Sequence, residues 1–236
     1  MTPPGTYTAR LEEKLQHSNR FTQYSFELVE PNLLEFQAGQ HISIKVSDQG
    51  ERRSYSICST PDNQHQFDLL IDYSPGGLGV NFFQNLEFGA EIEVLAPMGE
   101  FVIPQDLTVD HLFFVATGSG VAPFKSMIED QLRIKQDQRQ ITLHWGMRLP
   151  EDLFWLEEWQ DLDETFTNFH FHPVLSQAPK TWTLCRGRVT DCLSVHERPS
   201  NAAYFLCGNQ DMVKDVTTLL TDQGVNQELI LTERFY

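Results

Sequence analysis

Cysteine is scarce in this sequence, and its spacing is unlike that of a metal site. The four cysteines stand at positions 58, 185, 192 and 207, with no CxxC pair among them. Structural zinc sites and iron–sulfur clusters take closely grouped cysteines, so we expect neither, and we expect no metal. Two disulfides are arithmetically possible, but a chain of 236 residues without a signal sequence is more typical of reduced thiols.

Long apolar runs are also missing. No stretch approaches the roughly 20 continuous apolar residues that a membrane span requires. The first seven residues, MTPPGTY, lack the basic and then apolar pattern of a signal peptide. We therefore expect a cytoplasmic protein without membrane insertion.

Basic residues are few, since 17 Lys and Arg face 33 Asp and Glu, for a net charge of −16. Such a charge repels nucleic acid phosphates and anionic lipid, so both are excluded as expected partners. The hydrophobic fraction of 40%, with 17 Phe, is sufficient for real cores. The sequence therefore predicts a folded, acidic protein.

The first hundred residues carry the pattern of short strands separated by Gly and Pro turns, which is typical of a barrel or sandwich. Beyond Pro104, apolar runs alternate with segments of helical period, as in a parallel sheet covered on both faces. We therefore predict a β-barrel domain over residues 1–104 and an α/β domain over 105–236. The expected strands are 21–30, 41–46, 53–59, 67–73, 91–95, 111–117, 141–146 and 203–208, and the expected helices are 121–135, 152–161 and 211–223.

The sharpest local pattern is RSYS at residues 53–56 on a predicted strand. With a side-chain period of two, Arg53 and Tyr55 share one face, and Ser54 and Ser56 share the other. An exposed Arg beside an aromatic can bind a phosphate while the ring packs on a flat ligand. The alternative is an ordinary barrel strand with a surface Arg and a core Tyr.

A glycine-rich stretch follows at residues 74–81 (SPGGLGVN) and leads into a helical turn at 82–86. Unhindered backbone N–H groups at a helix N-terminus suit a pyrophosphate. The alternative is a flexible hairpin turn.

The second domain has a similar arrangement, in which strand 113–117 is followed by a GSG turn at 118–120 and by a helix containing Pro123. This predicts a second phosphate site, although neither GxGxxG nor GxSxG occurs. Segments 145–148 (WGMR) and 207–213 (CGNQDMV) end later strands, where parallel sheets bind ligands. For Cys207 the alternative is a small buried hydrophobe.

Taken together, these motifs resemble the ferredoxin–NADP reductase superfamily of flavoproteins, especially its bacterial NAD(P)H:flavin and oxygenase-reductase branches, over residues 6–236. The resemblance implies an antiparallel Greek-key barrel that binds FAD and a doubly wound domain that binds NADH or NADPH. RSYS is similar to the family's RxYS signature, in which Arg binds flavin phosphates, Tyr packs on the ring and Ser lies near flavin N5. Val80 departs from the family's Ser or Thr, and Ala96 replaces the first glycine of a GPxGxF turn. The flavin-binding residues implied are Arg53, Ser54, Tyr55, Ser56, Ile71, Asp72, Tyr73, Gly77, Leu78, Gly79 and Val80.

On the nucleotide side, residues 117–123 resemble the family's GTGxAP segment. Many NADPH users carry Arg after the serine at 176, but here Gln177 follows, which favours NADH unless Arg186 or Arg188 compensates. Residues 232–236 resemble C-termini that place an acid and an aromatic beside the flavin; the alternative is a final strand with a frayed end. The nucleotide- and flavin-side residues implied are Thr117, Gly118, Gly120, Pro123, Arg148, Ser176, Arg186, Cys207, Gly208, Met212, Phe235 and Tyr236.

The reaction implied is hydride transfer from nicotinamide to FAD, followed by release of electrons to a ferredoxin-like carrier, an oxygenase component or free flavin. Ser56, Cys207 and Glu233 are the implied catalytic residues. Without grouped cysteines we expect no fused ferredoxin module, and a basic patch of Arg10, Lys14, Arg20 and Arg52 is the hypothetical docking surface for an acidic acceptor. The alternative of another class is a non-catalytic subunit that keeps this fold within a larger redox complex.

Overall fold

The structure is a computed structural model that describes residues 3–196 and 199–234. The chain divides by its contacts into two units. One unit comprises Met1–Ile103 with Ala122–Lys135, and the other comprises Pro104–Val121 with Gln136–Tyr236. Each is described here by itself.

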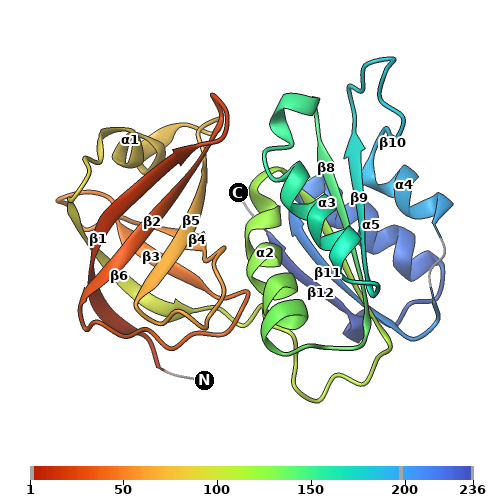
Figure 1. Ribbon diagram of the computed structural model, residues 1–236, viewed down its shortest axis with the longest axis horizontal. Coiled ribbons are helices and arrows are strands. Elements are labelled where there is room, and N and C mark those ends of the chain that lie inside the picture. Colours follow the sequence, from red (N-terminus) through yellow and green to blue (C-terminus); the bar gives the residue numbers. More distant parts are fainter. Residues whose placement is uncertain (1–2, 197–198, 235–236) are drawn as a thin grey trace. The chain divides into compact units, whose positions relative to one another are not determined.

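Six antiparallel strands form the sheet of the first unit, in the order β4-β3-β6-β1-β2-β5 (Figure 1). The outer strands β4 and β5 approach each other through a bridge between Ile57 and Leu69, which closes the sheet toward a barrel. The predicted antiparallel barrel is confirmed. The strands are β1 (Gly5–Gln16), β2 (Phe21–Glu30), β3 (His41–Lys45), β4 (Arg52–Ser56), β5 (Gln66–Asp72) and β6 (Glu91–Met98).

Strand β1 has no counterpart among the predicted strands. Its first half alternates, with Tyr7, Ala9 and Leu11 buried, but its last four residues are all exposed. The polar second half of β1 therefore shows no strand pattern in the sequence. This strand depends on its tertiary pairing with β2 and β6.

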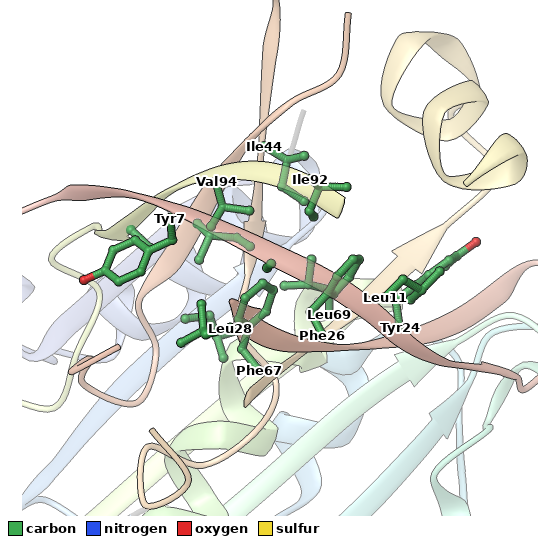
Figure 2. Packing of buried hydrophobic residues seen from close by; sticks show 14 of the residues in the cluster. Tyr7, Leu11, Tyr24, Phe26, Leu28, Ile44, Phe67, Leu69, Ile92 and Val94 are labelled. Atoms are coloured by element: carbon green, nitrogen blue, oxygen red, sulfur yellow. The ribbon is translucent and has the colours of Figure 1, made fainter. Parts of the chain in front are cut away.

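The barrel interior is filled by aliphatic and aromatic side chains from β1, β2, β3, β5 and β6 (Figure 2). Phe26 and Phe67 stack with ring centroids 5.3 Å apart, and Tyr24 lies 4.8 Å from Phe83. Burying each such side chain contributes about 1.5–3 kcal/mol. The core holds strands β2 and β5 beside α1 (Gly77–Asn85), which carries Phe83.

The second unit holds a fully parallel sheet in the order β10-β9-β8-β7-β11-β12 (Figure 1). Trp159 of α3 packs against Phe169 and Phe171 on one face, whereas α4 and α5 cover the face that carries Phe113 and Tyr204. Helices on both faces confirm the doubly wound prediction. The strands are β7 (His111–Thr117), β8 (Gln140–Met147), β9 (Phe169–Leu175), β10 (Cys185–Arg186), β11 (Ala202–Gly208) and β12 (Ile230–Arg234).

The helices differ in part from the prediction. The expected helix 152–161 is wrong at its start, because a short 3₁₀ turn at Pro150–Asp152 comes first and α3 (Leu156–Thr165) begins later. The expected helix 121–135 is a 3₁₀ turn (Gly118–Val121), α2 (Ala122–Glu129) and a π-helical turn (Asp130–Ile134). Helix α4 (Val189–Val195) was not predicted, whereas α5 (Gln210–Asp222) lies within one residue of its expected bounds. A short 3₁₀ turn at Gln227–Leu229 precedes β12.

All four cysteines are free thiols. Across residues 3–196 and 199–234, each helix is too short or too polar to span a bilayer.

Candidate functional site

Strand β4 places Arg53 and Tyr55 together against Gly79 of α1. A methyl group added at Gly79 would lie 2.2 Å from the Tyr55 hydroxyl oxygen and 3.3 Å from Arg53 Cγ. Only glycine allows the helix backbone to approach this close to the two side chains. Arg53 is exposed and Ser56 on the opposite face is buried, so the alternation expected for RSYS holds between them, although Ser54 is exposed.

The glycine-rich stretch is the start of a helix, which corrects the predicted loop. Helix α1 begins at Gly77 rather than at residue 82, and Gly76 and Gly77 have φ of 66° and 84°. These left-handed glycines turn the chain into the helix, where Gly76 supplies no side-chain cap. Gly77 and Leu78 are exposed, whereas Gly79 and Val80 are buried. The first turn therefore presents backbone N–H groups that suit an anion.

An aromatic group supports this region. The Tyr55 ring meets Phe83 edge-on at 5.1 Å, and burial raises the pKa of Tyr55 to about 12 against the opposing charge of Arg53. Tyr24 donates to the Phe83 carbonyl oxygen over 2.8 Å and also hydrogen-bonds Tyr73. Tyr55 is thus a neutral phenol whose ring is held in place by Phe83.

The end of β5 divides into core and surface residues. Ile71 is buried in the barrel core, so its side chain is unavailable to a ligand. Asp72 accepts two hydrogen bonds from Arg20, at 2.9 and 2.6 Å. Burial raises the pKa of Asp72, but the bonds from Arg20 and Ser74 outweigh it and hold the pKa below its usual range.

In the second unit, the ends of β7 and β11 lie side by side, where the strand order reverses. A methyl group at Gly120 would lie 2.3 Å from the Cys207 carbonyl oxygen, and one at Gly208 would lie 2.5 Å from Thr117 Oγ1. Gly208 has φ of 135° and Gly118 has φ of 58°. Open α/β sheets bind ligands at such a switch point. Here the two glycines approach the backbone of Cys207 and both the backbone and the hydroxyl of Thr117.

Two further residues fix this switch point; they lie in the predicted segments 145–148 and 207–213 but were not among the site residues named individually. Trp145 Nε1 donates to the Gly118 carbonyl oxygen over 3.0 Å. The Asn209 amide N–H donates to Thr117 Oγ1 over 3.1 Å, while the Asn209 side chain caps α5. An Asn directly before a helical segment is an N-cap signal that could have identified Asn209.

Cys207 and Glu233 are neighbours across β11 and β12. The Cys207 thiol lies 4.0 Å from Glu233 Oε2, and the residue is fully buried. Burial, and then the Glu233 carboxylate, raise the pKa of Cys207 well above its usual value. The thiol therefore stays protonated at neutral pH, as a donor and not as a nucleophile.

The remaining expected nucleotide residues are spread over several elements. Arg148 and Ser176 are exposed after β8 and β9, where the Ser176 and Gln177 amides bond the Met147 and Arg148 carbonyl oxygens, both at 3.0 Å. The Met212 side chain, which belongs to α5, is buried in the core, and Pro123 is buried at the start of α2. Phe235 and Tyr236 lie outside the described residues.

The four residues of the hypothetical basic patch on the first unit are all engaged with other groups. Arg10 pairs with Glu12 and Glu27, and Arg52 pairs with Glu93. Arg20 pairs with Asp72, and Lys14 donates to the Leu86 carbonyl oxygen. Neighbouring acids therefore offset the charges of three of these cations, whereas Lys14 lies on a neutral carbonyl oxygen and keeps its charge. The docking surface stays a prediction.

Two family models match the chain in tandem. An oxidoreductase FAD-binding domain covers residues 8–103, and an oxidoreductase NAD-binding domain covers residues 114–218. The chain belongs to the ferredoxin–NADP reductase superfamily. It therefore carries a FAD-binding and an NAD-binding domain of the oxidoreductase type.

Among relatives in this superfamily, the reductase component of phenol 2-monooxygenase from Pseudomonas sp. (strain CF600) is 30% identical over 208 residues, 86% of this chain and 58% of that protein. The Amycolatopsis reductase GcoB has a TM-score of 0.89 at 26% identity, covering 100% of this chain and 71% of that one. A Neisseria gonorrhoeae ferredoxin NADP+ reductase, solved with FAD and NADP, shares the fold with a TM-score of 0.84 at 22% identity, covering 98% and 99% of the two chains. The chain spans 48% to 59% of the length of the first curated relatives it matches.

Proposed function

We propose that the protein oxidises NADH or NADPH through a bound FAD and passes the electrons to an external acceptor. The observation that carries this proposal is the glycine-only approach of Gly120 to Cys207 and Gly208 at the switch point of the second sheet. A backbone surface at that place suits the pyrophosphate of a dinucleotide. On the barrel, the corresponding ligand-binding surface is the backbone at Gly79, which lies beside Arg53 and Tyr55.

We assign FAD binding to residues 1–104 and nucleotide binding to residues 105–236. The two family-model ranges support this division. Arg53 would bind flavin phosphates through its planar guanidinium, and the α1 amides would bind them through their N–H groups. Tyr55 would pack its neutral ring on the flavin.

FAD, when bound, accepts a hydride and releases electrons singly or in pairs. The chain's part is to hold and orient the reactants and to supply protons. We assign Ser56, Cys207 and Glu233 to that part. The protonated Cys207 thiol beside Glu233 provides a donor and an acceptor within 4.0 Å of each other.

NADH is the proposed nucleotide. A 2′-phosphate is best bound by a guanidinium, and the position after Ser176 holds Gln177 instead. Arg186, which could compensate, already donates to the carbonyl oxygens of Pro179 and Lys180, over 2.8 and 3.1 Å.

The proposed acceptor is an oxygenase component or a ferredoxin-like carrier, because reductase and electron-transfer components of oxygenases are prominent among the relatives. Free flavin is the second candidate acceptor. The cytoplasm is the proposed location.

The test begins with the purified protein and its flavin content. We expect a yellow protein that NADH bleaches under anaerobic conditions, and that reduces ferricyanide and a ferredoxin faster with NADH than with NADPH. Turnover of free flavin without retained FAD would favour the free-flavin reductase. A colourless protein that neither binds FAD nor oxidises NADH would contradict the proposal and favour a non-catalytic subunit.

A further inference from the structure

The second unit holds a cluster of imidazole and thiol groups that the proposed reaction does not use. It consists of His144 on β8, Cys192 on α4 and His196 at the end of α4. His144 and Cys192 are buried and His196 is half-buried. Since Cys192 and His196 are four residues apart on a helix, their side chains share one face, and that face is turned toward β8.

The distances within this cluster match those of a tetrahedral metal site. Cys192 Sγ lies 3.3 Å from His144 Nδ1 and 3.6 Å from His196 Nδ1. With zinc–nitrogen bonds of about 2.1 Å and zinc–sulfur bonds of about 2.3 Å, tetrahedral ligands lie about 3.6 Å apart. One ligand atom from each of the three residues lies within 4.8 Å of the others. A small rotation of each side chain would therefore bring all three onto one ion.

A second cysteine lies on a neighbouring element. Cys185, on the short strand β10, is half-buried and packs against the core cluster that contains Cys192. Two sulfurs and two imidazoles form one of the usual donor sets of structural zinc. Outside this set, His172 stacks over His196 with ring centroids 3.9 Å apart and over His144 at 4.7 Å, which restricts both rings.

We propose that His144, Cys192 and His196 bind a divalent cation of the zinc class, with Cys185 or a water as the fourth ligand. The competing account of the cluster is its hydrogen bonds, those of Cys192 Sγ with His144 and His196 and that of His196 Nδ1 with the Cys192 carbonyl oxygen over 2.8 Å. Binding would release the thiol protons to solvent, since thiolate and neutral imidazole are the forms that coordinate. The ion would join β8 to α4, and so fix the helix that begins directly after Arg188.

The test uses the flavin-loaded protein, reduced, stripped with a chelator and titrated with Co²⁺. We expect one cobalt per chain, with ligand-field bands at the red end of the visible spectrum, where oxidised flavin does not absorb. Zn²⁺ should abolish those bands by displacement. X-ray absorption of the zinc-loaded wild-type protein should show a shell of mixed sulfur and nitrogen, a measurement that needs no variant.

Cys192→Ser and His196→Gln should each weaken cobalt binding at least tenfold. His170→Gln is the matched control, because His170 is an exposed histidine in the same sheet that pairs with Asp163. Absence of stoichiometric cobalt bands in the wild-type protein would overturn the proposal. So would equal binding by all three variants, or a Cys185–Cys192 disulfide in freshly purified protein that holds no metal.

Discussion

Gly79 is the residue on which the proposed FAD site depends most directly. An added methyl group would meet the Tyr55 hydroxyl at 2.2 Å, and Phe83 limits the retreat of that ring. Overpacking of this kind costs about 1–3 kcal/mol, which corresponds to about 5- to 140-fold in affinity. We predict that Gly79→Ala raises the Kd for FAD by this factor, measured by fluorescence titration of the stripped protein.

Two variants separate a local collision from general damage. Gly79→Ala combined with Tyr55→Phe removes the colliding oxygen and should bind FAD better than Gly79→Ala alone. Gly5→Ala, whose methyl group would meet Tyr7 at an ordinary 3.4 Å, should leave binding unchanged. Equal affinity of Gly79→Ala and the wild-type protein would exclude backbone approach at this glycine as a requirement for FAD.

Gln177 is the residue through which nucleotide choice can be changed. Gln177→Arg would add a guanidinium after Ser176, where it can pair with a 2′-phosphate through two hydrogen bonds. We predict a rise of about 10-fold or more in kcat/KM for NADPH relative to NADH. Gln223→Arg, at the exposed end of α5, adds the same charge elsewhere and should not change the ratio. A similar shift in both variants would assign the effect to overall charge.

Among the elements, β2 and β5 are joined at their ends by Arg20 and Asp72. The pair is partly buried and bidentate, with 11% exposure of the Asp72 side chain. Because the folded-state pKa of Asp72 is lowered, its contribution is present above the unfolded pKa of about 4 and is lost as pH falls through the folded value. We predict that Asp72→Asn lowers the free energy of unfolding by about 1–2 kcal/mol at pH 7.

The pH dependence distinguishes this ion pair from simple packing. Urea unfolding gives the free energy of unfolding of Asp72→Asn and of the wild-type protein. The difference between the two free energies should decrease as pH falls below about 4. Glu100→Gln, at an exposed position, should have almost the same free energy of unfolding as the wild-type protein at every pH. If Asp72→Asn and the wild-type protein differed by the same free energy of unfolding down to low pH, the electrostatic account would be contradicted.

The strands and helices that the sequence predicts are those in which the pattern of buried residues can be recognised within the element itself. The apolar runs at the centres of β7 and β8 and along all of β11 are buried, and buried and partly exposed residues alternate along most of β2, so these strands could be recognised. Strand β5 was recognised from its apolar run, since its residues 69–71 are all buried. Short β10 was missed because two residues carry no period, and α4 was missed because its seven residues are mostly small or polar.

The candidate sites divide in the same way. RSYS and the GSG turn could be found in sequence because each lies within a few residues. The approach of Gly120 to Cys207 could not, since it depends on β7 and β11 being neighbours in the sheet. The cluster of His144, Cys192 and His196 likewise joins residues from separate elements, whereas His170 and His172 were visible on one strand.

For the whole molecule, the net charge of −16 governs encounters with protein acceptors. With Arg10, Arg20 and Arg52 paired to acids, an acidic ferredoxin should be repelled by the net negative charge. Raising salt from ~0.01 M to ~0.15 M shortens the Debye length from ~30 Å to ~8 Å. We predict that ferredoxin reduction becomes about 3- to 10-fold faster over this range.

Neutral riboflavin provides the control, because its reduction should change little with salt. Stopped-flow rates with ferredoxin and riboflavin under the same conditions give the comparison. Slower ferredoxin reduction at high salt would reveal an attractive basic surface and contradict the prediction.

The division of the chain into two interleaved units limits how it can be dissected. Ala122–Lys135 belongs by contact to the unit of Met1–Ile103, and there the Met127 side chain lies against Gly39 while Phe124 meets Phe101 with ring centroids 5.9 Å apart. A gene fragment ending at residue 103 would therefore lack a helix that shields part of its interior. Transplanting the barrel into another reductase requires that helix to travel with it, either in the fused sequence or by rearranging the order of the segments.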